Sequence, residues 1–163
     1  MAEKNTAIII DDEEHVRTML CSTMKYLGFE IVGTASNGDE ALNLFNLKKP
    51  DLMLLDINIP RKTGIEVLEE IIQNYPDAMV IMLTAVSDIE SIQKCIKLGA
   101  TYFIRKDTPV PQMVKLIRKS LAIYEAKKAE LEVYKYDYIA MSMEIDDDES
   151  LCPSEIVHST KWG

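Results

Sequence analysis

The chain has 163 residues, of which 47% are apolar, and carries a formal net charge of −9. This size suits one globular domain with an appendage, and no apolar run approaches the roughly 20 residues of a membrane-spanning helix. The acidic balance argues against direct binding to nucleic acid, because contacts to phosphates need a basic patch.

Five apolar runs of strand length alternate along the chain with segments of helical period. The runs cover residues 7–10, 29–35, 52–55, 79–83 and 101–104. Ile8–Ile10 and Leu52–Leu55 are apolar at every position, as expected for strands that are covered on both faces.

The segments between these runs predict helices, because their apolar residues recur every three or four positions. Gly28, Pro50, Pro76 and Gly99 mark the expected ends of the first four helices, and a fifth helix begins near Pro109. The alternation predicts an α/β fold with a doubly wound, five-stranded parallel sheet and helices on both faces.

Polar residues follow four of the five runs. Asp11 and Asp12 follow the first, Asp56 the third, Thr84 the fourth and Lys106 the fifth, after one intervening residue. Parallel sheets bind ligands at the carboxyl ends of their strands, so we expect these side chains to share one site.

The residue types in this group predict a specific chemistry. Three carboxylates repel one another unless a cation joins them, and oxygen ligands suit magnesium. An ionised Asp56 could then attack a phosphoryl group in line, with Lys106 and Thr84 binding the phosphoryl oxygens. The expected product is an acyl phosphate on Asp56.

Four segments of the sequence carry a family resemblance. They are Ile8–Glu13, Asp56–Pro60 followed by Gly64, Leu83–Ala85 and Gly99–Lys106. In order and in spacing they resemble the motifs of response-regulator receiver domains, over roughly residues 5–124. The resemblance implies the flavodoxin-like strand order 2-1-3-4-5 and a two-component phosphoacceptor protein rather than an ordinary enzyme.

The resemblance also implies the ligands of a metal ion. Asp12 and Asp56 would bind Mg²⁺, or Mn²⁺, directly, and Asp11 would act largely through water. The backbone carbonyl of Asn58 would complete the coordination shell.

Further positions would govern switching and the lifetime of the phosphoryl group. Phosphorylation would draw Thr84 toward the phosphoryl group and let Phe103 turn inward. Asn58 and Val86 occupy the positions that tune dephosphorylation in the family. Because neither is a general base, we expect slow autodephosphorylation.

One position departs from the family pattern. Most receivers have proline after the lysine, with a cis peptide bond before it, whereas Asp107 follows Lys106 here. The segment 106–109 resembles receivers that precede a helix-turn-helix DNA-binding domain. No such domain follows in this sequence, so we expect the chain to act through protein contacts.

Two apolar stripes divide the C-terminal part of the chain. The core face of the last receiver helix is predicted from Val110, Val114, Ile117, Leu121 and Tyr124. A second stripe comprises Leu131, Tyr134, Tyr138, Met141 and Ile145, with no sheet to cover. We predict a receiver domain over 1–124, a helical extension over 125–145 and an acidic, disordered tail over 146–163.

The expected phosphoryl donor is a histidine kinase or a histidine phosphotransfer protein in the cytoplasm, where Cys21 and Cys95 would stay reduced. Homodimers could form through the face made by the fourth helix, fifth strand and fifth helix, or through the C-terminal helix. Two other functions remain open: a phosphorylation-independent adaptor that binds through this helix, and a phosphorelay intermediate.

Overall fold

The computed structural model describes residues 4–85 and 89–145, so Val86 and the segment 146–163 lie outside the described residues. The chain divides into two units, residues 1–123 and 124–163. Helix α5 (Val110–Ile145) contributes residues to both.

Five parallel strands form the centre of the first unit. They are paired in the order β2-β1-β3-β4-β5, which confirms the predicted fold class and strand order. Their bounds are Thr6–Ile10 (β1), Glu30–Ala35 (β2), Leu52–Asp56 (β3), Val80–Thr84 (β4) and Tyr102–Arg105 (β5). Every residue of β3 and β4 is buried, which explains why their apolar positions are consecutive.

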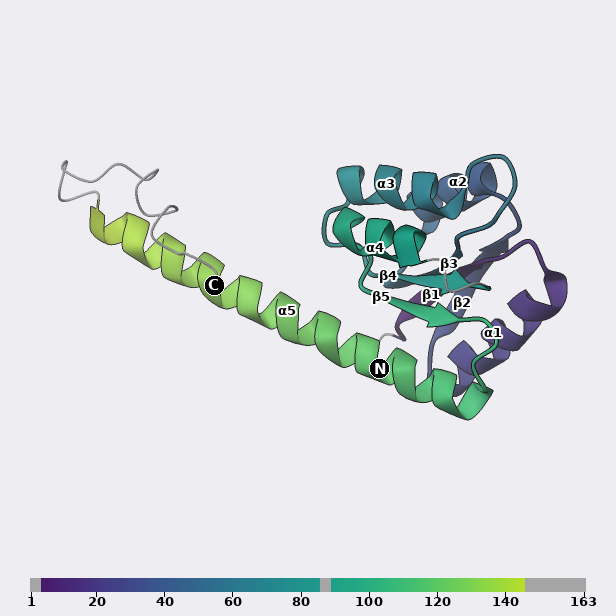
Figure 1. Cartoon of the computed structure of the whole chain (residues 1–163). Coiled ribbons are helices and arrows are strands. Elements are labelled where there is room, and N and C mark those ends of the chain that lie inside the picture. Colours follow the sequence, from purple (N-terminus) through teal and green to yellow (C-terminus); the bar gives the residue numbers. More distant parts are fainter. Residues whose placement is uncertain (1–3, 86–88, 146–163) are drawn as a thin grey trace. The chain divides into compact units, whose positions relative to one another are not determined.

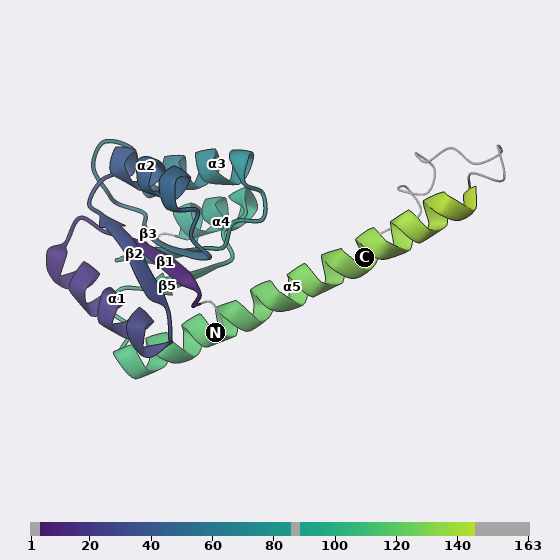
Figure 2. The same cartoon turned by 180° about the vertical axis from the view of Figure 1, so that it is seen from behind.

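Helices cover both faces of the sheet (Figure 1). Helices α2, α3 and α4 lie on one face, and α1 lies with the first turns of α5 on the other, as the reverse view also shows (Figure 2). The helices are α1 (Glu14–Tyr26), α2 (Gly38–Lys48), α3 (Gly64–Asn74) and α4 (Ile89–Leu98). This arrangement leaves the carboxyl ends of the strands free to carry a site.

The buried face of α5 differs in part from the predicted stripe. Val114 and Ile117 are buried as expected, but Val110 is 41% exposed. Val110 is the first residue of the helix, and it lines a surface groove instead of the core. Met113 and Ser120 are fully buried, and Ser120 is satisfied because its hydroxyl donates to the Leu116 carbonyl at 2.7 Å.

Helix α5 is long but only weakly apolar. It spans 36 residues, yet neither it nor any other helix in the described part of the chain has the sustained apolarity needed to cross a bilayer.

The connection from β3 to α3 is packed tightly against the end of β3. The Gly64 amide donates to the Ile57 carbonyl at 2.8 Å, and a Cβ at position 64 would collide with the Asp56 carbonyl. Thr63 and Glu66 close the helix N-terminus with a reciprocal capping box. The contacts of Gly64 fix the backbone directly after Asp56.

Replacing Gly64 with alanine tests this close approach. Helix propensity alone would favour alanine by about 1 kcal/mol, but the collision should outweigh it. We expect Gly64→Ala to lower the free energy of unfolding by about 1–3 kcal/mol, measured by urea denaturation. A variant as stable as the wild type would contradict the contact.

Gly28→Ala is a matched control for this substitution. A Cβ at position 28 meets nothing within 4 Å, but Gly28 has a φ of +90°. Gly28→Ala should therefore lower the free energy of unfolding by about 1–2 kcal/mol, through the left-handed backbone conformation alone and without a collision.

Candidate functional site

The residues singled out at the strand ends lie along one edge of the sheet. Asp56 is the last residue of β3 and pairs in register with Leu83, and Thr84 ends β4 opposite Arg105. The Lys106 amide donates to the Thr84 carbonyl at 2.8 Å. The sheet register therefore brings together side chains that are far apart in the sequence.

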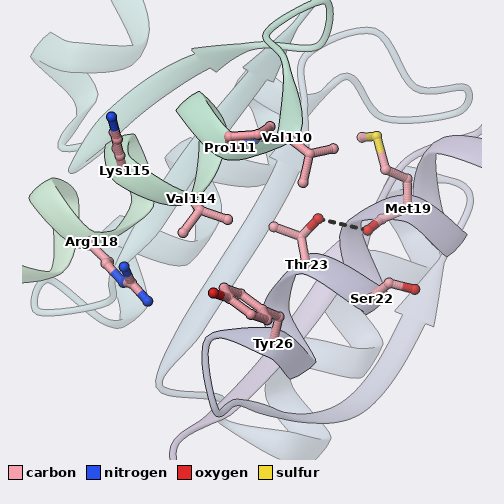
Figure 3. Close-up of a pocket in the computed structure, with 9 residues that line it drawn as sticks. All are labelled: Met19, Ser22, Thr23, Tyr26, Val110, Pro111, Val114, Lys115 and Arg118. Atoms are coloured by element: carbon pink, nitrogen blue, oxygen red, sulfur yellow. Dashed lines mark hydrogen bonds between the residues drawn. The ribbon is translucent and has the colours of Figure 1, made fainter.

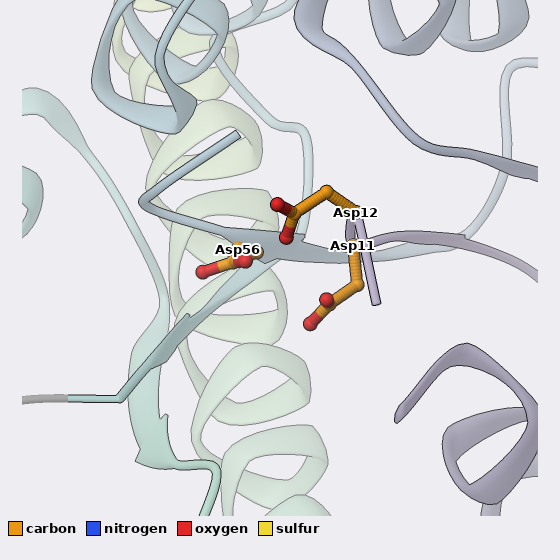
Figure 4. A group of neighbouring side chains, drawn as sticks. All are labelled: Asp11, Asp12 and Asp56. Carbon is orange, nitrogen blue, oxygen red and sulfur yellow. The ribbon is translucent and has the colours of Figure 1, made fainter. Parts of the chain in front are cut away.

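Three carboxylates gather at this edge (Figure 4). One oxygen from each of Asp11, Asp12 and Asp56 lies within 4.8 Å of the others. Asp11 and Asp56 are buried, and Asp12 is exposed. The donor set consists of oxygen atoms alone and has one side open to solvent, which fits a hard divalent cation that retains some water.

The Lys106 ammonium bridges the buried carboxylates. Its Nζ atom lies 2.8 Å from Asp11 Oδ2, 2.8 Å from Asp56 Oδ2 and 3.1 Å from Glu13 Oε1. The contact with Asp56 is a hydrogen bond, whereas Asp11 Oδ2 is buried without a partner in hydrogen-bond geometry. The Lys106 ammonium thus faces an excess of negative charge from Asp11, Asp56 and Glu13.

Burial raises the pKa of Asp56 to about 6. Loss of solvent around the carboxylate is the main cause, and the neighbouring charge of Asp11 adds to it. The hydrogen bond and charge of Lys106, and the Asn58 amide, act in the opposite direction. The Asn58 amide donates to Asp56 Oδ1 at 3.2 Å.

Lys106 remains a cation in this environment. Burial alone would lower its pKa, but hydrogen bonds and attraction from Asp11 and Asp56 outweigh burial and raise the pKa of Lys106. Its ammonium is therefore a permanent positive charge at the edge of the sheet near neutral pH.

Glu13 and Arg17 belong to this cluster but were not among the predicted site residues. The Glu13 amide donates to Asp11 Oδ1 at 2.9 Å, and Arg17 Nη1 donates to the Asp11 carbonyl at 2.6 Å. Glu13 is the N-cap of α1, yet its side chain makes no capping hydrogen bond. Glu13 follows Asp11 and Asp12 directly in the sequence. This third consecutive acidic residue was the signal from which its place in the cluster could have been predicted.

The other predicted site residues differ in their surroundings. Thr84 is buried, and Phe103 is half-buried against the hydrophobic core. The Asn58 side chain is exposed. Val86 lies outside the described residues.

The segment after Lys106 has a trans backbone. No peptide bond in residues 4–85 and 89–145 is cis, including the bond between Lys106 and Asp107. Asp107 instead forms a two-point ion pair with Arg105, through Arg105 Nε at 2.9 Å and Nη2 at 2.6 Å. Hydrogen bonding to the guanidinium lowers the pKa of the exposed Asp107.

A groove lies between α1 and the start of α5 (Figure 3), and none of the three carboxylates lines it. It has a volume of about 530 Å³ and is lined by Met19, Ser22, Thr23, Tyr26, Val110, Pro111, Val114, Lys115 and Arg118. Its lining offers no carboxylate and therefore no candidate oxygen ligands of the kind that gather at the strand ends.

The sequence of residues 7–118 matches the response regulator receiver domain family. Chemotaxis protein CheY of Listeria monocytogenes is 35% identical over 113 residues, which are 69% of this chain and 95% of CheY. Regulatory protein AtoC of Escherichia coli is 32% identical over 128 residues, which are 78% of this chain but only 28% of AtoC. The chain therefore spans little more than a quarter of that relative.

Solved structures share the fold. CheY of Borrelia burgdorferi, in a complex with CheX, beryllofluoride and magnesium, matches with a TM-score of 0.69 and 27% identity, covering 72% of this chain and 89% of that chain. NtrX of Brucella abortus matches with a TM-score of 0.73 and 26% identity, covering 80% of this chain and 30% of that chain. The family match, the strand order and the acidic pocket agree: this chain belongs to the response regulator receiver domain family, whose members are phosphoacceptor signalling modules rather than ordinary enzymes.

Proposed function

We propose that Asp56 accepts a phosphoryl group from the phosphohistidine of a histidine kinase or a histidine phosphotransfer protein. The observation that carries this proposal is the placement of Asp56, buried at a strand end, between a permanent cation and two further carboxylates. Membership of the receiver family supports the same role.

The proposed metal is Mg²⁺, with Mn²⁺ as a substitute. Carboxylate oxygens of Asp11, Asp12 and Asp56 would hold it, together with the backbone carbonyl of Asn58. The oxygen-only donor set of three neighbouring carboxylates supports this assignment. When bound, the ion supplies positive charge that offsets the carboxylates and the incoming phosphoryl oxygens.

The transfer step follows from the geometry of Asp56. A carboxylate oxygen of Asp56 attacks the phosphorus atom, forming an O–P bond as the P–N bond to the donor imidazole breaks. The imidazole nitrogen keeps the electron pair of that bond, and a ring that is protonated on its other nitrogen leaves as neutral imidazole. Lys106 then pairs with a phosphoryl oxygen, and the Thr84 hydroxyl donates to another.

The same contacts would convert phosphorylation into a change of surface. Thr84 moves toward the phosphoryl group, and Phe103 turns from its half-buried position into the space that this movement opens. The altered face of β4 and β5 would change which proteins bind. Asn58 and Val86 would set the rate of dephosphorylation, which we expect to be slow because neither offers a general base.

Intact-mass measurement after incubation with acetyl phosphate and Mg²⁺ tests the acceptor. We expect the wild-type chain to gain one phosphoryl mass, and Asp56→Asn and a chelated sample to gain none. Asp39→Asn is the matched control, because Asp39 is half-exposed and lies outside the acidic pocket. A wild-type chain that never gains the mass would favour the phosphorylation-independent adaptor.

The raised pKa of Asp56 predicts how stability depends on pH without divalent ions. The folded chain binds the Asp56 proton more tightly than the unfolded chain, in which the pKa is near 3.8. This group's contribution to the free energy of unfolding therefore falls as the pH rises from about 4 to about 6. Asp56→Asn removes that loss.

We expect Asp56→Asn to be more stable than the wild type by about 1–3 kcal/mol at neutral pH without metal, and to lose this advantage below about pH 4. Adding Mg²⁺ should stabilise the wild type more than the variant. Urea denaturation at several pH values measures both effects. If the free energies of unfolding of the two proteins changed with pH in parallel, Asp56 would not have a raised pKa in the folded chain.

Lys106→Ala separates phosphoryl transfer from switching. We expect the variant still to gain the phosphoryl mass, because the attacking oxygen and the metal ligands remain. Amide NMR shifts at Thr84 and Phe103, induced by beryllofluoride and Mg²⁺ in the wild type, should be largely lost. Lys97→Ala, which removes an exposed lysine from α4, should keep them. Unchanged shifts in Lys106→Ala would contradict the role given to Lys106.

A further inference from the structure

The second unit exposes apolar side chains at a spacing that suits association of helices. Within α5, Leu131 is 55% and Tyr134 is 47% exposed. In the sequence these two belong to a seven-residue repeat that also contains Tyr124, Tyr138, Met141 and Ile145. Residues at these intervals occupy the a and d positions of a coiled coil, and we call this set the seam.

Charged residues flank the seam in a fixed pattern. Lys128 and Lys135 fall at successive e positions, and Glu130 and Asp137 fall at successive g positions. All four are exposed. Lys135 contacts Glu132 of its own helix only at 3.6 Å, with both side chains more than half exposed, so it can turn toward another partner at little cost.

The charge pattern distinguishes the two orientations of a helix pair. In a parallel pair, g positions meet the e positions of the following repeat in the other helix, so Glu130 of one copy faces Lys135 of the second copy, twice by symmetry. In an antiparallel pair, e faces e and g faces g. Lysines would then oppose lysines and acids would oppose acids, which is unfavourable.

We propose that α5 pairs with α5 of a second copy of this chain as a parallel, in-register coiled coil over residues 124–145. Leu131 and Tyr134, both exposed, supply apolar contact at the centre of the seam, and the Glu130–Lys135 pairs select the parallel orientation. The tyrosines of the seam, and Lys127 at a d position that no apolar residue fills, weaken the packing, so the dimer is expected to dissociate on dilution. The proposal does not depend on phosphorylation of Asp56.

Two exposed residues on the same helix provide matched controls. Val133 and Tyr136 are 58% and 72% exposed, but they fall at c and f positions, away from the seam. Leu131→Asp and Val133→Asp add the same charge in place of similarly exposed aliphatic side chains, but only Leu131 belongs to the seam.

Sedimentation of the full chain over a range of concentrations tests the dimer. We expect a reversible monomer–dimer equilibrium, and a dimer dissociation constant raised at least about tenfold by Leu131→Asp but changed less than about threefold by Val133→Asp. A wild-type chain that is monomeric up to roughly 0.1 mM would overturn the proposal. So would a dimer that both substitutions weaken equally, because the interface would then lie elsewhere.

Charge exchange and cross-linking test the orientation. Glu130→Lys and Lys135→Glu should each weaken the dimer, and the double exchange should restore it. Leu131→Cys should form a disulfide-linked dimer under mild oxidation, whereas Val133→Cys should not. Failure of the double exchange to restore dimerisation, or equal cross-linking at both positions, would exclude the parallel coil.

Discussion

The carboxyl-terminal edge of the sheet depends on the contacts of the Lys106 ammonium with the carboxylates of Asp11, Glu13 and Asp56. Burying Asp11 and Asp56 beside each other is unfavourable, and the Lys106 ammonium, at 2.8 Å from both, offsets only part of their charge. Burial, and to a smaller extent the neighbouring charge of Asp11, raises the pKa of Asp56. A site of this kind gains from binding a further cation, and with the cation bound it can accept the negative charge of a phosphoryl group.

The fold maintains this imbalance through its backbone. The Lys106 amide is tied to the Thr84 carbonyl, and the Ile57 amide to the Leu83 carbonyl, so the residues around the pocket are held by hydrogen bonds that continue the sheet. The close approach of Gly64 to Asp56 fixes the other side. Because strands β3 and β4 are buried throughout, the carboxylate cannot relieve its repulsion by moving away without disturbing the core.

Consecutive apolar runs and polar strand ends are local signals, and they predicted the strands and the members of the acidic pocket. The order of the strands was implied only by the family resemblance. Sequence reasoning did not predict which carboxylates pair with Lys106. That pairing depends on the sheet register and on the conformation of the loop between β1 and α1, which positions Glu13. Neither is encoded within a short segment. The exposure of Val110 was missed for a related reason: a helical stripe indicates a face, but not where along the helix the sheet begins to cover it.

The two units draw their stability from different sources. Residues 110–123 of α5 bury Met113, Ile117 and Ser120 within the first unit, and this packing stabilises the helix there. Residues 124–145 contain neither glycine nor proline, but an isolated helix of about 20 residues with few alanines is only marginally stable in water. Pairing of the seam would stabilise the helix and bury its apolar side chains in the same step. Helicity and self-association of this segment should therefore rise together, so that the local concentration of the chain controls both.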